Sequence, residues 1–177
     1  MKRFIFLLIA MSVFLSSCIY AIRYDGPYRG KVVEAETGEP IEGVVVLGVW
    51  YTVTVTPAGG THNFYDATET VTDKNGEFKI SGKGLRILSN LEPMQVTIFK
   101  VGYEYLNFPW DEYLKEYKRI KWEGSKAIIP LRKLTMEERR RRYVDKETIP
   151  DNKQQLLIKE LNKEYKELGI PLYPEEN

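Results

Sequence analysis

Alternation between apolar and polar positions dominates the middle of the 177-residue chain. Residues 41–55 are rich in β-branched and aromatic side chains, and Val49, Tyr51, Val53 and Val55 follow a period of two, which is typical of a half-buried strand. Similar segments, separated by Gly, Pro and Asp, recur at residues 28–36, 64–72, 77–81, 92–102 and 126–133. About six or seven short strands with this punctuation predict a mainly β chain folded as an antiparallel β-sandwich.

Two turn sequences indicate how these strands are connected. The Thr-Gly-Glu-Pro sequence at residues 37–40 separates the first two strands, which predicts two strands of a meander. Asn75-Gly76 readily adopts positive φ, so a tight hairpin is expected between residues 64–72 and 77–81.

The N-terminus has the layout of a secretory signal. A positively charged start is followed by an almost entirely apolar segment at residues 4–15 and by Ser16-Ser17 before Cys18. The apolar segment is shorter than the ~20 residues that a membrane-spanning helix needs, and the polar residues 23–27 could not extend it. We therefore expect the segment to be removed, or to hold the chain only transiently.

The sequence Leu15-Ser16-Ser17-Cys18 resembles the bacterial lipobox. The resemblance implies a thioether-linked diacylglycerol on Cys18, cleavage just before it, and an N-acyl chain on the new terminus. Cys18 is the only cysteine, so it cannot form an internal disulfide, and lipidation gives this odd thiol a role. Two other interpretations remain: a small residue near an ordinary signal cleavage site, or a buried thiol in an uncleaved N-terminal helix.

These patterns predict a lipoprotein signal peptide at residues 1–17 and a tether at residues 18–27. The acyl chains on Cys18 would hold the protein durably on a membrane, because two or three chains anchor where one does not. Ile19 follows the cysteine where Asp resembles an inner-membrane retention signal, so the outer membrane is favoured over the inner membrane. We expect no cofactor apart from the covalent diacylglycerol and N-acyl chain on Cys18.

The charge balance gives no indication of a nucleic-acid partner. The chain has 26 Lys and Arg against 25 Asp and Glu, and losing Lys2 and Arg3 with the signal peptide leaves a formal balance of −1. A near-neutral exported chain has no general attraction for polyanions. The expected partners are therefore the membrane and a protein of the cell envelope.

Three motifs in the middle of the chain resemble the carboxypeptidase regulatory-like domain. Residues 30–46 are similar to its G-x-V…T-G-x-P-I-x-G-V-x-V start, and residues 72–80 are similar to its T-D-x-x-G-x-F-x-I hairpin. Val-Gly-Tyr-Glu at residues 101–104 is similar to its later G-Y-E turn. The resemblance covers residues 28–104, with a final strand near residues 127–131.

This resemblance implies a fold like that of transthyretin, a seven-stranded antiparallel Greek-key sandwich, at residues 28–133. It also implies a non-catalytic accessory module of a secreted or envelope protein. Two stretches depart from the family pattern, residues 47–71 and an aromatic insertion at residues 105–124. Sites accumulate on loops of a rigid scaffold, so a specific function is expected in these departures.

The insertion concentrates aromatic side chains and predicts a short helix that begins at Pro109. The candidate interaction surface consists of Tyr105, Phe108, Trp110, Tyr113, Tyr117 and Trp122. Two interpretations remain open. The rings at helical spacing could pack as a lid on one sheet, or some of them could stay exposed as a docking surface, which suits the apolar area and polar handle of Tyr and Trp.

The C-terminal residues 134–177 predict a helical extension. Thr135 and Glu138 resemble a capping box for a short charged helix, and Asp151 could cap a second helix that stops at Gly169. Its apolar stripe is Leu157, Ile158, Leu161, Tyr165 and Leu168. This stripe predicts packing on the sandwich, with binding of a partner as the alternative.

Four consecutive arginines at residues 139–142 raise the question of phospholipid headgroups. Glu137 and Glu138 precede Arg141 and Arg142 by four residues, the favourable order for pairs on a helix surface. We therefore expect a solvated helix face, with headgroup contact as the alternative.

No catalytic or metal-binding constellation emerges. His62 is the only histidine and is expected in a loop, and no serine lies in a nucleophile-elbow context. The sequence thus predicts a membrane-anchored, non-catalytic envelope lipoprotein that acts as an interaction or structural module. The alternative is a module that binds carbohydrate, such as cell-wall glycan. The sandwich at residues 28–133 is expected to fold without the terminal helices.

Overall fold

The computed structural model describes residues 22–57, 59–110 and 119–174, and these residues form a mainly β molecule with ten strands and two C-terminal α-helices. The strands are β1 (Ile22–Asp25), β2 (Tyr28–Glu34), β3 (Val45–Thr56), β4 (Gly59–Val71), β5 (Glu77–Ile80), β6 (Gly84–Ile87), β7 (Gln95–Phe99), β8 (Leu106–Pro109), β9 (Lys121–Glu123) and β10 (Lys126–Leu131). The helical segments are α2 (Met136–Arg141), the 3₁₀ turn η2 (Asp151–Lys153) and α3 (Gln155–Leu168).

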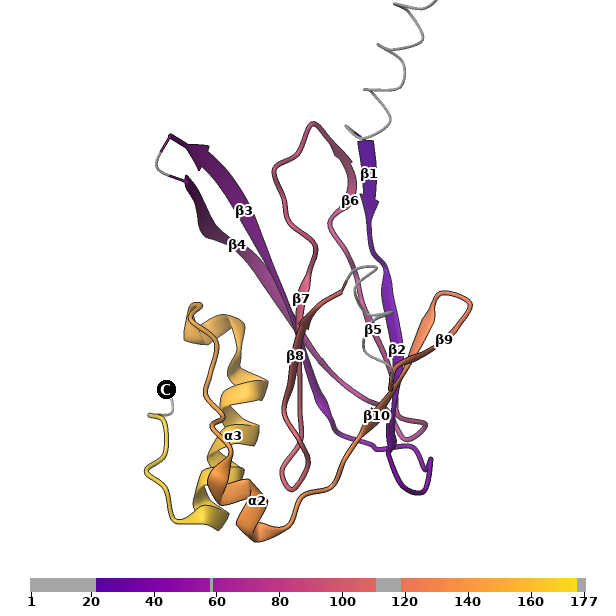
Figure 1. Cartoon of the computed structure of the whole chain (residues 1–177), viewed down its shortest axis with the longest axis vertical. Helices are drawn as coiled ribbons and strands as arrows, with labels where there is room; N and C mark the ends of the chain where they lie inside the picture. The colour runs from indigo at the N-terminus through magenta and orange to yellow at the C-terminus, as the bar shows by residue number, and fades with distance from the viewer. Residues whose placement is uncertain (1–21, 58, 111–118, 175–177) are drawn as a thin grey trace, which may run out of the picture.

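Two four-stranded sheets face each other (Figure 1). We call the sheet with strand order β5-β2-β10-β9 the outer sheet, and the sheet with order β4-β3-β7-β8 the central sheet. The pairing is antiparallel except between β2 and β10, where Arg29 lies beside Lys126 in a parallel register. The remaining strands, β1 and β6, pair with each other as a separate two-stranded ribbon.

The first hydrophobic core fills the space between the two sheets. Alternate residues of β3 point to opposite faces, so Val46 and Trp50 enter this core while Leu47 and Val49 point away from it. The outer sheet contributes side chains such as Ile129, which is fully buried. The predicted sandwich is therefore present, built from the apolar alternation that the sequence displays.

The tight turn at Gly76 is present but does not form the predicted hairpin. Gly76 has φ +73°, and its N–H donates a hydrogen bond to the Asp73 carbonyl oxygen at 2.8 Å. However, β4 pairs with β3 and β5 pairs with β2, so the turn carries the chain from the central sheet to the outer sheet. A Cβ atom on Gly76 would lie 2.4 Å from the carbonyl oxygen of Val32, so the glycine also permits this close approach.

The predicted meander through residues 37–40 is likewise wrong. β2 belongs to the outer sheet and β3 to the central sheet, so these consecutive strands do not pair. Turn residues specify the local path of the backbone, whereas the pairing partner is decided by which faces can share a core.

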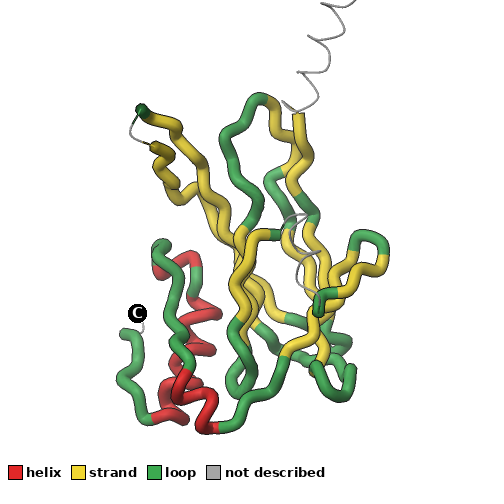
Figure 2. Tube along the Cα trace, viewed as in Figure 1, coloured by secondary structure: helices red, strands yellow, loops and turns green. Residues whose placement is uncertain are grey.

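The C-terminal extension forms a third layer on the central sheet (Figure 2). Leu157 and Leu161 of α3 are fully buried in a second hydrophobic core against Val45, Leu47 and Phe99 of the central sheet. The predicted packing on the sandwich is thus confirmed for Leu157 and Leu161 of the apolar stripe. Val144 and Ile149, from the segment between α2 and η2, belong to the same second core.

Some of the predicted ends of the two helices are present and one is not. The predicted capping box is present, because Thr135 accepts from the Glu138 backbone and Glu138 accepts from the Thr135 backbone. Gly169 ends α3 in the left-handed conformation, as predicted. Asp151 does not cap α3, since it begins the 3₁₀ turn η2 instead. Glu69 of β4 accepts from the backbone N–H groups at the start of α3, at 2.8 and 2.9 Å.

Candidate functional site

The described aromatic residues of the insertion divide between the core and the surface. Phe108 and Trp110 are 2% and 9% exposed and belong to the first core. The Trp110 ring makes edge contacts with Tyr28, Phe78 and Trp122 at centroid distances of 5.8–5.9 Å. Both buried rings are therefore packed between the sheets and offer no docking surface.

The other residues of the candidate interaction surface have different positions. Tyr105 is half-buried against the second core, and Trp122 of β9 is 38% exposed. Tyr113, Tyr117 and the predicted helix after Pro109 lie outside the described residues, as does Cys18.

A polar groove occupies the part of the central sheet that α3 leaves uncovered. It has a volume of about 350 Å³ and mixes carboxylate, amide, phenol and imidazole groups. The lining residues are Val49, Tyr51, His62, Glu92, Gln95, Thr97, Asn107 and Glu147. Seven of these come from the sheet and its connections, while Glu147 comes from the segment before η2, so the C-terminal extension supplies one wall of the groove.

Glu147 is held rigidly at its position in this wall. Its Oε1 accepts hydrogen bonds from Thr97 Oγ1 at 2.7 Å and from Tyr105 OH and Asn107 Nδ2 at 2.8 Å each. Its backbone exchanges two further hydrogen bonds, both at 2.8 Å, with the fully buried side chain of Gln154. A carboxylate fixed by this many donors is preorganised, because little side-chain freedom is left to lose when a ligand binds.

Burial and the charge of Glu147 together favour the protonated form of the phenols beside it. Burial, followed by the negative charge of Glu147, raises the pKa of Tyr51, and the same two causes raise the pKa of Tyr105. Both phenols therefore remain protonated hydrogen-bond donors at neutral pH.

His62 lies at another edge of the groove. It was expected in a loop, but it lies within β4, which begins at Gly59. Its Nδ1 is 2.7 Å from Glu92 Oε2, and the side chain is 60% exposed. The groove can thus offer donors and acceptors to a small polar ligand. No group of three or more His, Cys, Asp or Glu in the described part of the chain could hold a metal ion.

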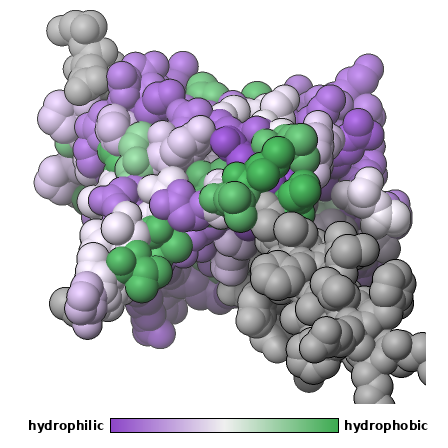
Figure 3. All heavy atoms as spheres, turned by 90° about the horizontal axis from the view of Figure 1, so that it is seen from above, coloured by the Kyte–Doolittle hydropathy of each residue, from purple (hydrophilic) through white to green (hydrophobic). Residues whose placement is uncertain are grey.

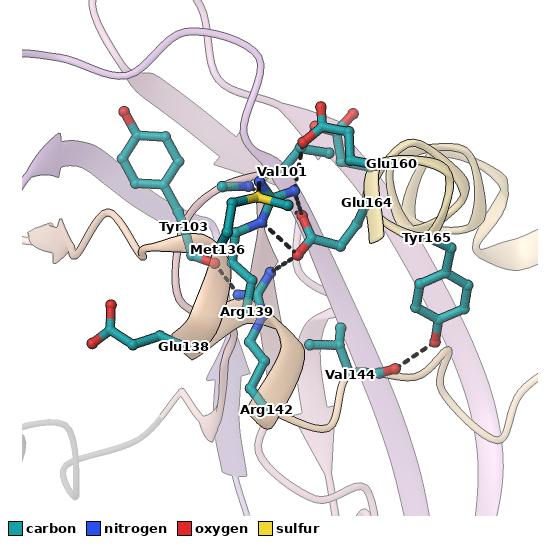
Figure 4. Close-up of polar contacts among 12 residues, drawn as sticks. Val101, Tyr103, Met136, Glu138, Arg139, Arg142, Val144, Glu160, Glu164 and Tyr165 are labelled. Carbon is teal, nitrogen blue, oxygen red and sulfur yellow. Dashed lines mark hydrogen bonds and ion pairs between the residues drawn. The ribbon is translucent and has the colours of Figure 1, made fainter. Parts of the chain in front are cut away.

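The arginines 139–142 form the expected solvated face only in part: Arg140 and Arg141 are exposed, whereas Arg139 and Arg142 are turned toward α3 (Figure 4). Arg139 is only 7% exposed, and it donates from Nε and one terminal nitrogen to the two carboxylate oxygens of Glu164 at 2.9 and 2.7 Å. Arg142 donates to Glu164 at 2.7 Å instead of pairing with Glu138. Of the predicted pairs, only that between Arg141 and Glu137 forms.

Buried carboxylates of α3 explain this arrangement. Glu164 also accepts from the Gly102 backbone N–H, and Glu160 accepts from that of Val101, each at 3.2 Å. The helix therefore ties α2 and the turn after β7 together, and the buried Glu164 needs the two arginines as partners. Arg139 and Arg142 hold the fold together and are not free to contact lipid headgroups.

The ribbon of β1 and β6 is a feature that the sequence analysis missed, since Ile22–Asp25 falls in the expected tether. Its base is fixed by the buried side chain of Asp25, which accepts from Trp50 Nε1 at 3.0 Å, Tyr28 OH at 2.5 Å and the Lys83 N–H at 2.6 Å. A Cβ atom on Gly82 would lie 2.0 Å from the Asp25 carbonyl oxygen, so the two backbones cross in direct contact. The alternating segments Ile-Arg-Tyr and Leu-Arg-Ile are the sequence signal for these strands.

Comparison of the chain with protein-family models, with curated proteins and with solved structures found no match in any of the three. The resemblance to the carboxypeptidase regulatory-like domain therefore stays a prediction that depends on the three motifs. Within the described residues, no helix has the length and apolar character needed to cross a membrane.

Proposed function

We propose that this protein is a membrane-anchored, non-catalytic envelope lipoprotein that acts as an interaction or structural module. The single observation that carries the proposal is Leu15-Ser16-Ser17-Cys18 at the end of a short apolar segment with a positively charged start. Diacylglycerol and an N-acyl chain on Cys18 attach the protein to the membrane. Ile19 favours sorting to the outer membrane.

The fold gives this proposal physical support. The strand β1 begins at Ile22, only four residues after Cys18, so the domain would be presented close to the membrane. Two packed cores and a buried network of ion pairs make a rigid body, which suits a module that presents surfaces to a partner.

Mass spectrometry of the membrane form tests the lipid anchor. We expect the mature chain to begin at Cys18 and to carry the mass of the acyl chains. Cys18→Ser should accumulate as an unprocessed precursor, because the thiol that accepts the diacylglycerol is lost, whereas the control Ser17→Ala keeps a small residue and should be processed normally. An unmodified Cys18, or cleavage elsewhere, would overturn the proposal.

The polar groove favours a second candidate function, the binding of a carbohydrate such as cell-wall glycan. Amide, carboxylate and phenol groups in a groove of about 350 Å³ match what a sugar ring requires. Gln95→Ala should weaken the binding of soluble cell-wall glycan fragments by roughly fivefold, the value of one hydrogen bond. Gln155→Ala, a matched change at an exposed position of α3, should leave binding unchanged. Equal affinities of the wild type and both variants, measured by calorimetry, would exclude the groove as the glycan site.

A further inference from the structure

The apolar side chains of the ribbon formed by β1 and β6 point toward solvent, where polar side chains are usual for a protein surrounded by water. Ile22 pairs with Ile87 and Tyr24 with Leu85, so these four side chains share one face, which we call the apolar ribbon face. They are 53%, 61%, 70% and 61% exposed, respectively. A cluster of this kind on a two-stranded ribbon indicates a surface that something else covers.

The opposite face of the ribbon carries two arginines and is turned toward the protein. Arg23 lies opposite Arg86 in the register, and both are half-buried. Arg23 donates to the carbonyl oxygen of Leu91, while Arg86 donates to the Tyr65 hydroxyl at 3.3 Å and lies over its ring. With the base of the ribbon fixed by Asp25, these contacts hold the apolar face outward.

Two further exposed apolar side chains lie near this end of the molecule. Leu88 is 84% exposed and has φ +49°, a left-handed conformation that residues other than glycine rarely adopt. Val55, 83% exposed, is the second-last residue of β3, whose hairpin with β4 points toward the same end of the molecule (Figure 1). Figure 3 looks down on this end and shows several apolar patches with polar surface between them.

This surface lies where the proposed lipid anchor would hold it. Three residues lie between Cys18 and Ile22, so the four steps from one Cα atom to the other reach at most about 14 Å when fully extended. The apolar ribbon face is thus confined near the membrane surface, whereas α2 and α3 lie toward the other end of the molecule (Figure 1).

We infer that the apolar ribbon face enters the boundary between lipid headgroups and acyl chains, and so orients the domain on the membrane that carries it. This inference rests on the proposed lipid anchor for the location of the face. Each methylene that enters the acyl region strengthens partitioning about fourfold. Tyr24 suits the same boundary, because its ring is apolar and its hydroxyl can remain hydrated.

A bilayer fits this face better than a protein partner does. All four side chains of the face are uncharged, and the arginines beside them are engaged on the inner side of the ribbon. The face therefore offers no charge pattern with which to choose a particular protein. The tether would also keep the bilayer within reach at all times, at a high effective concentration.

An experiment with an artificial tether tests the inference independently of Cys18. The chain from residue 19 onward contains no cysteine, so Leu88→Cys gives one attachment point for a polarity-sensitive fluorophore. An N-terminal histidine tag holds this chain on vesicles of phosphatidylethanolamine, phosphatidylglycerol and a nickel-chelating lipid. We expect a blue shift and quenching by nitroxide-labelled lipids.

Matched controls separate insertion from mere proximity. A fluorophore at Leu172→Cys, an exposed site in the C-terminal segment, should show neither change. Adding Leu85→Ser and Ile87→Ser should abolish the blue shift and quenching at position 88, whereas Ile170→Ser should preserve them. Thermal unfolding of each variant confirms that these surface changes leave the fold intact.

Three results would overturn the inference. Fluorophores at positions 88 and 172 that both stay in water on tethered vesicles would exclude insertion. A blue shift that depends on protein concentration without vesicles would assign the face to a second copy of the chain. A shift only on adding an envelope protein fraction would assign it to a protein partner. Failure of lipidation would appear separately, in the mass of Cys18 from cells.

Discussion

Glu164 joins three parts of the chain through one carboxylate. It is 1% exposed, lies on α3, and accepts hydrogen bonds from Arg139 and Arg142 around α2 and from the backbone of Gly102 after β7. Burial alone would raise its pKa, but the hydrogen bonds from the two arginines outweigh this effect, so the pKa of Glu164 is lowered. The folded protein therefore favours the ionised form.

Replacing this carboxylate should destabilise the protein in a pH-dependent way. Glu164→Gln leaves two largely buried arginines without their main partner, so we expect a loss of about 3 kcal/mol at neutral pH. The pKa of Glu164 is lower in the folded than in the unfolded chain, so its contribution is complete above the ordinary value of 4.5 and is lost as the pH falls below it. Denaturant unfolding at several pH values should show the difference between wild type and variant shrinking below that pH.

An exposed glutamate provides the control for this prediction. Glu137 is 73% exposed and pairs with Arg141 on the surface of α2. Glu137→Gln should cost less than about 0.5 kcal/mol, as is usual for exposed pairs. Equal effects of the two substitutions would show that the buried network contributes no more than an ordinary surface pair.

At the scale of elements, α3 covers the central sheet with a face that the sequence identifies correctly. Leu157 and Leu161 both belong to the predicted apolar stripe and are fully buried. The start of the helix was not predictable in the same way, because its cap is Glu69, a side chain from β4 that is distant in the sequence. Capping rules based on nearby residues selected Asp151 for this reason.

Substitutions of two adjacent leucines at the start of α3 test how much this packing contributes to the free energy of unfolding. Leu157 is fully buried in the second core, whereas Leu156 is 40% exposed. Leu157→Ala should lower the free energy of unfolding by about 2–5 kcal/mol, since it leaves a cavity against the sheet. Leu156→Ala should cost less than about 1 kcal/mol, because it removes little buried area. Similar losses in a thermal or denaturant titration would mean that α3 is only loosely attached.

The shared second core also changes the expectation for the sandwich alone. From the sequence, residues 28–133 are expected to fold without the helices, since their strands and turns are local to that span. The structure places Val45, Leu47 and Phe99 under α3, so a chain ending at residue 133 would expose these side chains to water. The helical extension completes the core of the domain.

At the scale of the whole molecule, the sequence predicts layers better than surfaces. Period-two alternation identified most strands, and period 3.6 identified α3, because each pattern is local. The groove was missed because residues as distant as Tyr51, Gln95, Asn107 and Glu147 meet only in the folded chain. The parallel neighbour of β2 was missed for the same reason.

The ribbon of β1 and β6 was not predicted for a different reason. Each of its strands is only four residues long, too short for alternation to stand out, and Gly26-Pro27 reads as the end of a tether. Alternation separates the two faces of a strand but does not tell which face points toward the protein. The exposure of the apolar face is therefore known only from the structure.

The parallel pairing of β2 with β10 has a consequence for how the chain is made. In the outer sheet β2 lies between β5 and β10, yet β10 is synthesised after all the other strands. A lipoprotein exported N-terminus first would deliver β2 through the translocation channel long before its second neighbour. Neither the outer sheet nor the second core, which needs Leu161, can close until the end of the chain arrives. Such non-local pairing slows folding. Under the proposed export, this slow folding would leave the nascent chain unfolded for long enough to pass through the translocation channel.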